Sequence, residues 1–203
     1  MNIENIINNI VSNNEWHAKW LNTLSMMENS GARKISASEH PTKVNLIILK
    51  HAAEEARHAY YLKKQLSKLN YDGCEDYTFK NLLAPTESYQ YLHRLDTQVS
   101  RYIQTKLNLT GYELRYAAYL LVTYAIEVRA DSLYEIYQSA LKKYESRVTV
   151  KSIIAEEIGH LEEMTRQLED FSEDWKTHAE FAVNLEKELF QKWMSRVELE
   201  IAA

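Results

Sequence analysis

The sequence predicts an all-α protein, and three observations lead to this prediction. The 203 residues include only four glycines and two prolines, whereas strand-rich folds need many turns that use these residues. Hydrophobic residues make up 45% of the chain, which is enough for a buried core. Between Val44 and Tyr61, the residues expected to lie on one face of a helix follow one another at three- and four-residue intervals. We expect a single domain over residues 1–203.

The first two helices are bounded by turn residues. The first is expected from about residue 3 to residue 28, ending at the polar, glycine-containing segment 29–31. The second is expected to begin after Pro41, because the first turn of a helix tolerates proline. It should end near residues 70–73, which include a glycine.

Four more helices follow, giving six in total. Pro85 marks the start of the third helix, and Gly111 separates the third from the fourth. The segment LKKYESR turns the chain before the fifth. These helices are expected at about residues 86–107, 112–141, 148–168 and 174–199.

Composition argues against several functional classes. The net charge of −5 gives no support to nucleic-acid binding. Cys74 is the only cysteine, so an internal disulfide and a cysteine-rich metal cluster are excluded. The first residues show no basic segment followed by an apolar run, and no apolar stretch of about 18 residues occurs. We therefore expect a cytoplasmic protein without a membrane-spanning segment.

One short motif occurs twice. Glu55 and His58 form Glu-x-x-His in HAAEEARHAYYL, and Glu157 and His160 repeat that spacing in AEEIGHLEEM. Residues three apart lie close together on neighbouring turns, so each pair can present oxygen and nitrogen to one point. Two such helices, with one glutamate from each of two others, form dimetal sites in helical bundles.

The first single glutamate is expected to be Glu15. The first two helices should run antiparallel, because a short loop joins them. Glu15 lies about fourteen residues before the predicted end of its helix, and Glu55 about fourteen residues after Pro41. Glu28, the alternative, lies at the helix end, about 20 Å away along the axis at about 1.5 Å per residue. We therefore predict Glu15 as the ligand.

The second single glutamate is expected to be Glu127. It is the only acidic residue in YAAYLLVTYAIEV, a run with no polar face wide enough to point it at water. A buried carboxylate is normally paired or bound to a metal. One alternative is a salt bridge, with Arg129 or another arginine. The other is Glu135, which a symmetric hairpin places nearer the level of Glu157 but whose sequence neighbours are more polar.

In order and spacing, these residues resemble the ferritin-like di-iron carboxylate superfamily over roughly residues 5–168. The resemblance implies a ferritin-like four-helix bundle, with 86–107 as an additional crossover helix and 174–199 as a C-terminal helix. It implies two iron ions, or manganese, held by Glu15, Glu55, His58, Glu127, Glu157 and His160. IEVRADSLYEIY and AEEIGHLEEM together are also similar to segments of the tRNA-modifying di-iron hydroxylases.

Differences between this chain and known members of the superfamily indicate which class of member it resembles. Rubrerythrins carry an additional glutamate where this chain has Ala130, and often a cysteine-rich iron domain. Iron-storage ferritins lack the second histidine, here His160, although bacterioferritins have both. The additional helices at 86–107 and 174–199 would obstruct a storage cage. These differences favour an oxidase or oxygenase over iron storage.

The expected activity is therefore that of a dinuclear iron or manganese oxidoreductase. Its partners would be dioxygen or peroxide, an electron donor, and a small or nucleic-acid-linked organic substrate, with assembly as a homodimer. Two alternatives stay open: a ferroxidase or peroxide-detoxifying protein, and a helical interaction module without catalysis. The sequence does not identify the substrate.

Two further residues are candidate catalytic groups. Asp131 lies one turn after Glu127, where it could hold a ligating histidine in the required tautomer. An exposed acidic residue is an equally good interpretation of Asp131. Tyr124 lies one turn before Glu127, close enough to take part in radical chemistry, although packing explains such tyrosines more often.

Overall fold

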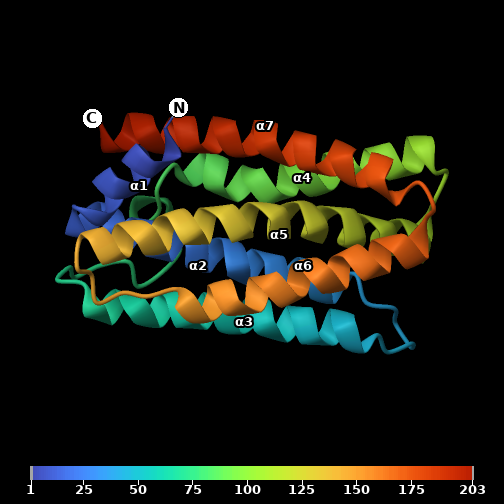
Figure 1. Ribbon diagram of the computed structural model, residues 1–203, viewed down its shortest axis with the longest axis horizontal. Coiled ribbons are helices and arrows are strands. Elements are labelled where there is room, and N and C mark those ends of the chain that lie inside the picture. The colour runs from blue at the N-terminus through green and yellow to red at the C-terminus, as the bar shows by residue number, and fades with distance from the viewer. Residues whose placement is uncertain (1, 203) are drawn as a thin grey trace.

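The computed structural model describes residues 2–202, which form seven α-helices, two short 3₁₀ turns and no strand (Figure 1). The predicted all-α class is confirmed. The helices are α1 (Ile3–Val11), α2 (Asn14–Ala37), α3 (Leu46–Gln65), α4 (Pro85–Lys106), α5 (Gly111–Lys143), α6 (Lys151–Phe171) and α7 (Trp175–Ile201). The 3₁₀ turns are η1 (Leu66–Lys68) and η2 (Phe79–Asn81).

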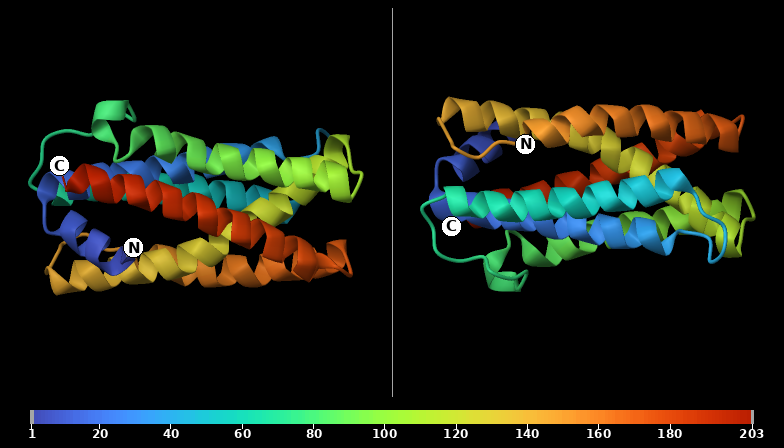
Figure 2. Two further views of the ribbon diagram at one scale, coloured as in Figure 1. Left: turned by 90° about the horizontal axis from the view of Figure 1, so that it is seen from above. Right: turned by 90° about the horizontal axis from the view of Figure 1, so that it is seen from below.

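The six long helices run roughly along the long axis of the molecule, and both chain ends lie at one end of it (Figure 1). α2 and α3 form one antiparallel hairpin, and α5 and α6 form another. α4 and α7 pack against each other and against α5, on the side away from α3. Seen from below, α3 and α6 lie on the same face of the molecule (Figure 2).

The predicted first helix begins correctly at Ile3, but it is interrupted and its predicted end at residue 28 is wrong. The chain breaks at residues 12–13, because the Asn13 side chain accepts hydrogen bonds from the backbone N–H groups of Glu15 and Trp16 and starts a new helix there. α2 then continues through Gly31 to Ala37. Packing in the tertiary structure keeps a glycine helical despite its low intrinsic propensity.

The second helix begins at Leu46 rather than next to Pro41, because Asn45 caps it by accepting from the N–H groups of Ile47 and Ile48. It ends at Gln65 and passes into η1. The other four predicted helices agree with α4, α5, α6 and α7 to within three residues at each end.

The apolar core joins all the helices. The rings of Trp20 and Trp193 stack with centroids 5.5 Å apart, which ties α2 to α7. Ile6, Ile7 and Ile10 bury one face of α1 against the end of the bundle. None of the helices within residues 2–202 combines the length and apolar character needed to span a bilayer.

A buried ion pair fixes α7 against α5. The Arg129 guanidinium donates two hydrogen bonds of 2.9 Å to the carboxylate of Glu186, which is 1% exposed. The Tyr91 hydroxyl from α4 donates to the same carboxylate. The partner of Arg129 is therefore Glu186 and not Glu127, so the salt-bridge alternative for Glu127 with Arg129 is wrong.

Candidate metal centre

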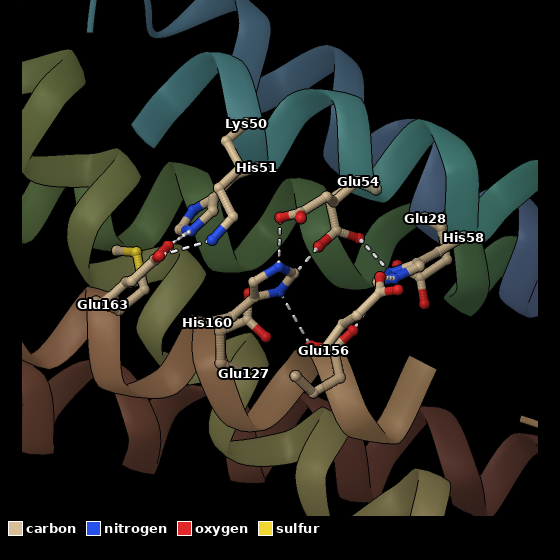
Figure 3. Close-up of polar contacts among 12 residues, drawn as sticks. Glu28, Lys50, His51, Glu54, His58, Glu127, Glu156, His160 and Glu163 are labelled. Carbon is tan, nitrogen blue, oxygen red and sulfur yellow. Dashed lines mark hydrogen bonds and ion pairs between the residues drawn. The ribbon is translucent and has the colours of Figure 1, made fainter. Parts of the chain in front are cut away.

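Six acidic and imidazole side chains meet between the two hairpins (Figure 3). They come from four helices: one glutamate from α2, a Glu-x-x-His pair from α3, one glutamate from α5 and a second pair from α6. They form two groups that share Glu55, and within each group the possible ligand atoms lie within 4.8 Å of one another. The groups are Glu28, Glu55 and His58, and Glu55, Glu127, Glu157 and His160.

Two carboxylates lie between the two histidines. Oε1 of Glu157 is 3.3 Å from Nδ1 of His58, and its Oε2 is 3.5 Å from Nδ1 of His160. Glu55 repeats this arrangement at longer range, with Oε2 3.8 Å from His58 and Oε1 3.9 Å from His160. Each of these carboxylates therefore turns one oxygen toward each histidine, so each could contribute to both positions of a metal pair.

The other two glutamates lie at opposite ends of the site. Oε1 of Glu127 is 3.6 Å from Nδ1 of His160, while Glu28 groups with His58. The hydroxyl of Tyr134 donates a hydrogen bond to Glu28. Each group thus contains one imidazole, the shared carboxylate of Glu55 and at least one glutamate of its own.

The far nitrogens of the histidines are held by two more glutamates (Figure 3). Nε2 of His58 lies 2.8 Å from Glu156 on α6, and Nε2 of His160 lies 2.8 Å from Glu54 on α3. The hydrogen bonds therefore cross between the helices. A carboxylate at Nε2 keeps the proton on that nitrogen and leaves Nδ1 free to bind a metal.

Glu54 and Glu156 are not among the residues predicted for the site, although the sequence carries a signal for both. Both motifs read Glu-Glu-x-x-His, so each orienting glutamate directly precedes a candidate ligand. Consecutive residues point to different sides of a helix, so the first glutamate of each doublet faces the neighbouring helix. The second glutamate faces the site.

Three buried atoms of the site have no hydrogen-bond partner: Nδ1 of His58, Nδ1 of His160 and Oε2 of Glu127. Buried polar atoms are normally bonded, and all three of these belong to residues of the two groups of possible ligands. Carboxylate oxygens and imidazole nitrogens suit iron and manganese. These residues therefore fit the pair of ions that the sequence analysis expected.

Without metal, the site holds protons. Burial and the nearby carboxylates raise the pKa of Glu28 and of Glu127 well above the usual range, and burial raises that of Glu55 to about 7. Burial lowers the pKa of His160, but the neighbouring carboxylates of Glu127 and Glu157 more than offset this and raise it to about 12. Metal ions compete with these protons because coordination requires ionised carboxylates and neutral imidazole.

Metal affinity is therefore expected to increase with pH. Between pH 6 and pH 8 the apparent affinity for Mn(II) should rise by about 100-fold, because release of one proton per binding event raises the affinity about tenfold per pH unit. Calorimetric titration in two buffers of different ionisation enthalpy measures the number of protons released. An affinity independent of pH, with no protons released, would contradict the protonation pattern of the metal-free site.

A seam of polar contacts between α3 and α6 covers the site (Figure 3). Arg57 donates two hydrogen bonds to Glu156 and lowers the pKa of that carboxyl to about 2. Glu163 binds both Lys50, at 2.6 Å, and Nε2 of His51, at 2.9 Å. The seam closes this face of the centre to water and aligns the two motifs.

Removing an orienting glutamate should weaken metal binding without removing a ligand. We expect Glu54→Ala or Glu156→Ala to lower Mn(II) affinity by about 10- to 100-fold, because the imidazole loses its fixed tautomer and orientation. Titration followed by electron paramagnetic resonance measures this. Glu162→Ala is the matched control, since Glu162 lies on α6 in an exposed pair with Arg166. Equal affinities in all these variants would exclude an orienting role.

The structure corrects the choice of Glu15. This side chain is 47% exposed, pairs with Lys19 at 2.8 Å and belongs to neither group of possible ligands. Glu28 lies nine residues before Ala37, the end of α2, and Glu55 lies nine residues after Leu46, the start of α3. In the antiparallel hairpin of α2 and α3, Glu28 and Glu55 therefore lie at the same height along the bundle axis. The predicted level of Glu15 along the bundle was wrong because α2 does not end near residue 28.

The structure places Glu127, rather than Glu135, in the cluster. Glu127 is 3% exposed, whereas Glu135 is exposed to solvent. The hairpin is not symmetric, because the chain doubles back along α5 before α6 begins. The N–H of Val150 donates to Oε1 of Gln138, well before the end of α5. This offset moves Glu157 toward Glu127.

The two predicted catalytic residues lie elsewhere. The Tyr124 ring packs edge-on against Trp175 of α7, with centroids 6.1 Å apart, and Tyr134 is the tyrosine that contacts the site. Asp131 lines a shallow surface depression with residues of α6, and the Nε2 atoms of the two histidines pair with Glu156 and Glu54 instead. Tyr124 and Asp131 lie one turn from Glu127 and point in only partly the same direction as Glu127. Their contacts are therefore made with the neighbouring helices, α7 for Tyr124 and α6 for Asp131.

Comparison of the chain with protein-family models, with curated proteins and with solved structures gave no match. The function therefore has to be inferred from the geometry and chemistry of the site.

Proposed function

We propose that this protein is a ferritin-like dimetal oxidoreductase, an oxygenase or oxidase that uses dioxygen or peroxide and two iron or manganese ions. One observation carries the proposal: two buried histidines turn unbonded Nδ1 atoms toward two shared carboxylates. The four helices that supply the ligands are arranged as two antiparallel hairpins, which supports the resemblance to the ferritin-like superfamily.

The charge of the ligand set supports a pair of divalent ions. Four glutamates offset four positive charges, and two neutral imidazoles complete the set without making the site more negative. Iron, if bound by these residues, would supply the redox chemistry needed to act on dioxygen or peroxide, with electrons from an external donor.

The chain's own groups position the ions and protect them. Glu54 and Glu156 hold the two imidazoles, and the α3–α6 seam excludes water on one side. On the other side, Glu28, Glu55 and Glu127 border a cavity of about 300 Å³. Cavities of this size hold small organic ligands. Space for an organic molecule beside the ligands supports an oxygenase or oxidase over a protein that handles iron alone.

The first test is the metal content. We expect close to two Fe(II) ions per chain after anaerobic reconstitution, measured by elemental analysis, and a change in the optical and Mössbauer spectra on exposure to oxygen. A His58→Ala, His160→Ala double variant should bind far less iron and keep its helical circular dichroism, because apolar packing forms the bundle. Persistent binding below one ion per chain in the unaltered protein would refute the proposal.

A further inference from the structure

The cavity beside the metal centre is long and narrow in outline. Along α2 its lining extends from Leu24 to Ser38, and along α5 from Tyr134 back to Leu114. Fourteen residues of helix span about 20 Å, at about 1.5 Å per residue. With a volume of about 300 Å³, the cavity has room for a slender molecule and not for a broad one.

Most of the cavity wall is apolar. Leu24, Met27, Ile35, Val122, Ile126 and Leu133 supply hydrocarbon surface along its length. Gly31 also lines it, and no atom lies within 4 Å of the place where a Cβ would stand. The missing side chain therefore widens the cavity. An apolar wall binds a hydrocarbon by removing it from water.

The two ends of the cavity differ in charge. The carboxylates of Glu28, Glu55 and Glu127 border it at the metal centre, where an anionic group would be repelled. The other end carries Lys34, Asp96 and Arg115. Lys34 and Asp96 pair at 2.6 Å and neutralise each other. The Arg115 guanidinium lies 6.0 Å from the centroid of the Tyr112 ring, and none of the ion pairs among the described residues includes it. A net positive charge is left there.

We propose that this cavity binds a single-chain anionic amphiphile, such as a medium-chain carboxylate. Its hydrocarbon chain lies between α2 and α5 and reaches the carboxylates of Glu28 and Glu127. Its charged group stays at the outer end beside Arg115. The inference rests on the proposed function in that the chain carbons near the centre would be the substrate atoms. Binding itself needs only the cavity and Arg115.

Calorimetric titration with dodecanoate tests the cavity in the full-length protein, both metal-free and loaded with Mn(II). We expect saturable binding of one molecule per chain in both forms. Gly31→Leu should weaken binding by at least about tenfold, because its side chain occupies space needed by methylene groups. The matched control is Ser36→Leu, which adds the same side chain to an exposed position of α2 outside the cavity.

A second pair of variants tests the charged end without altering the cavity. Arg115→Gln should weaken dodecanoate binding by about two- to fivefold, as expected for an exposed ion pair, and leave dodecan-1-ol binding unchanged. Arg101→Gln is the control, since Arg101 is exposed on α4 and lies outside the cavity lining. No binding of dodecanoate to the unaltered protein, or equal binding to Gly31→Leu, would overturn the inference.

The two proposals fail in different ways. If two metals bind and dodecanoate does not, the amphiphile inference is wrong and the dimetal proposal stands. If dodecanoate binds as described but metal stays below one ion per chain, the cavity is a ligand site in a protein without a dimetal centre. Gly31→Leu should fold normally, because replacing a helical glycine by leucine favours the helix; its thermal unfolding measures this directly.

Discussion

Glu28→Gln is expected to reduce metal binding from two ions per chain to one, whereas Glu15→Gln should leave both ions bound. The amide of glutamine lacks the negative charge that would offset the cation, and Glu28 belongs to the group that contains His58. Glu15 is exposed and paired with Lys19, so its loss changes only a surface contact. Elemental analysis of the two variants, reconstituted side by side with Fe(II), distinguishes them.

For Glu127→Gln we predict the sign of the change in the free energy of unfolding. Glu127→Gln should lower metal occupancy at the His160 position, yet be neutral or stabilising in the metal-free protein. Burial and the nearby Glu157 raise the pKa of Glu127, so clustered carboxylates oppose its ionisation when no metal is present. Urea unfolding with and without metal measures both effects. A large loss of stability in the metal-free variant would mean that Glu127 has a structural partner instead.

Glu186→Ala is expected to destabilise the protein by about 3 kcal/mol, whether or not metal is present. Removing one member of a buried ion pair leaves the other charge without compensation, which costs roughly 3–5 kcal/mol. We take the lower end because the Arg129 side chain is 21% exposed and can recover some hydration. Urea unfolding of the metal-free protein gives the free energy directly.

An exposed ion pair between the same layers serves as the control. Glu87 on α4 and Arg196 on α7 lie 3.3 Å apart, with side chains that are 32% and 59% exposed. Glu87→Ala should therefore cost less than about 1 kcal/mol. Equal losses in the two variants would mean that Glu186 contributes no more than a surface charge. Unchanged metal binding in both variants would place the Arg129–Glu186 pair outside the metal centre.

Some of the site could be predicted from the sequence because the signals are local. Glu55 and His58, like Glu157 and His160, are three residues apart, and helix geometry alone puts each pair on one face. Glu127 stands in an apolar run without a polar face, so its burial follows from the residues around it. These features need no knowledge of the neighbouring helix.

The hydrogen-bond partners of the two histidines could not be predicted from the sequence in the same way. Glu54 and Glu156 precede the two motifs in identical fashion, but their role depends on α3 and α6 lying side by side. The cavity is similarly non-local, since its lining residues come from five helices. The helix that carries a side chain fixes the direction in which the side chain points. Its contacts depend on how the other helices pack around it.

The helical class, the two Glu-x-x-His motifs and the burial of Glu127 were determined by the sequence itself, since each depends on the pattern of residues within a helix. Only the tertiary structure decided between Glu15 and Glu28. Both residues lie on α2, and the choice depends on their level along the bundle axis relative to Glu55. That level depends on where α2 ends and α3 begins. Packing carries α2 past Gly31, and a cap at Asn45 delays α3, so the site lies opposite Glu28.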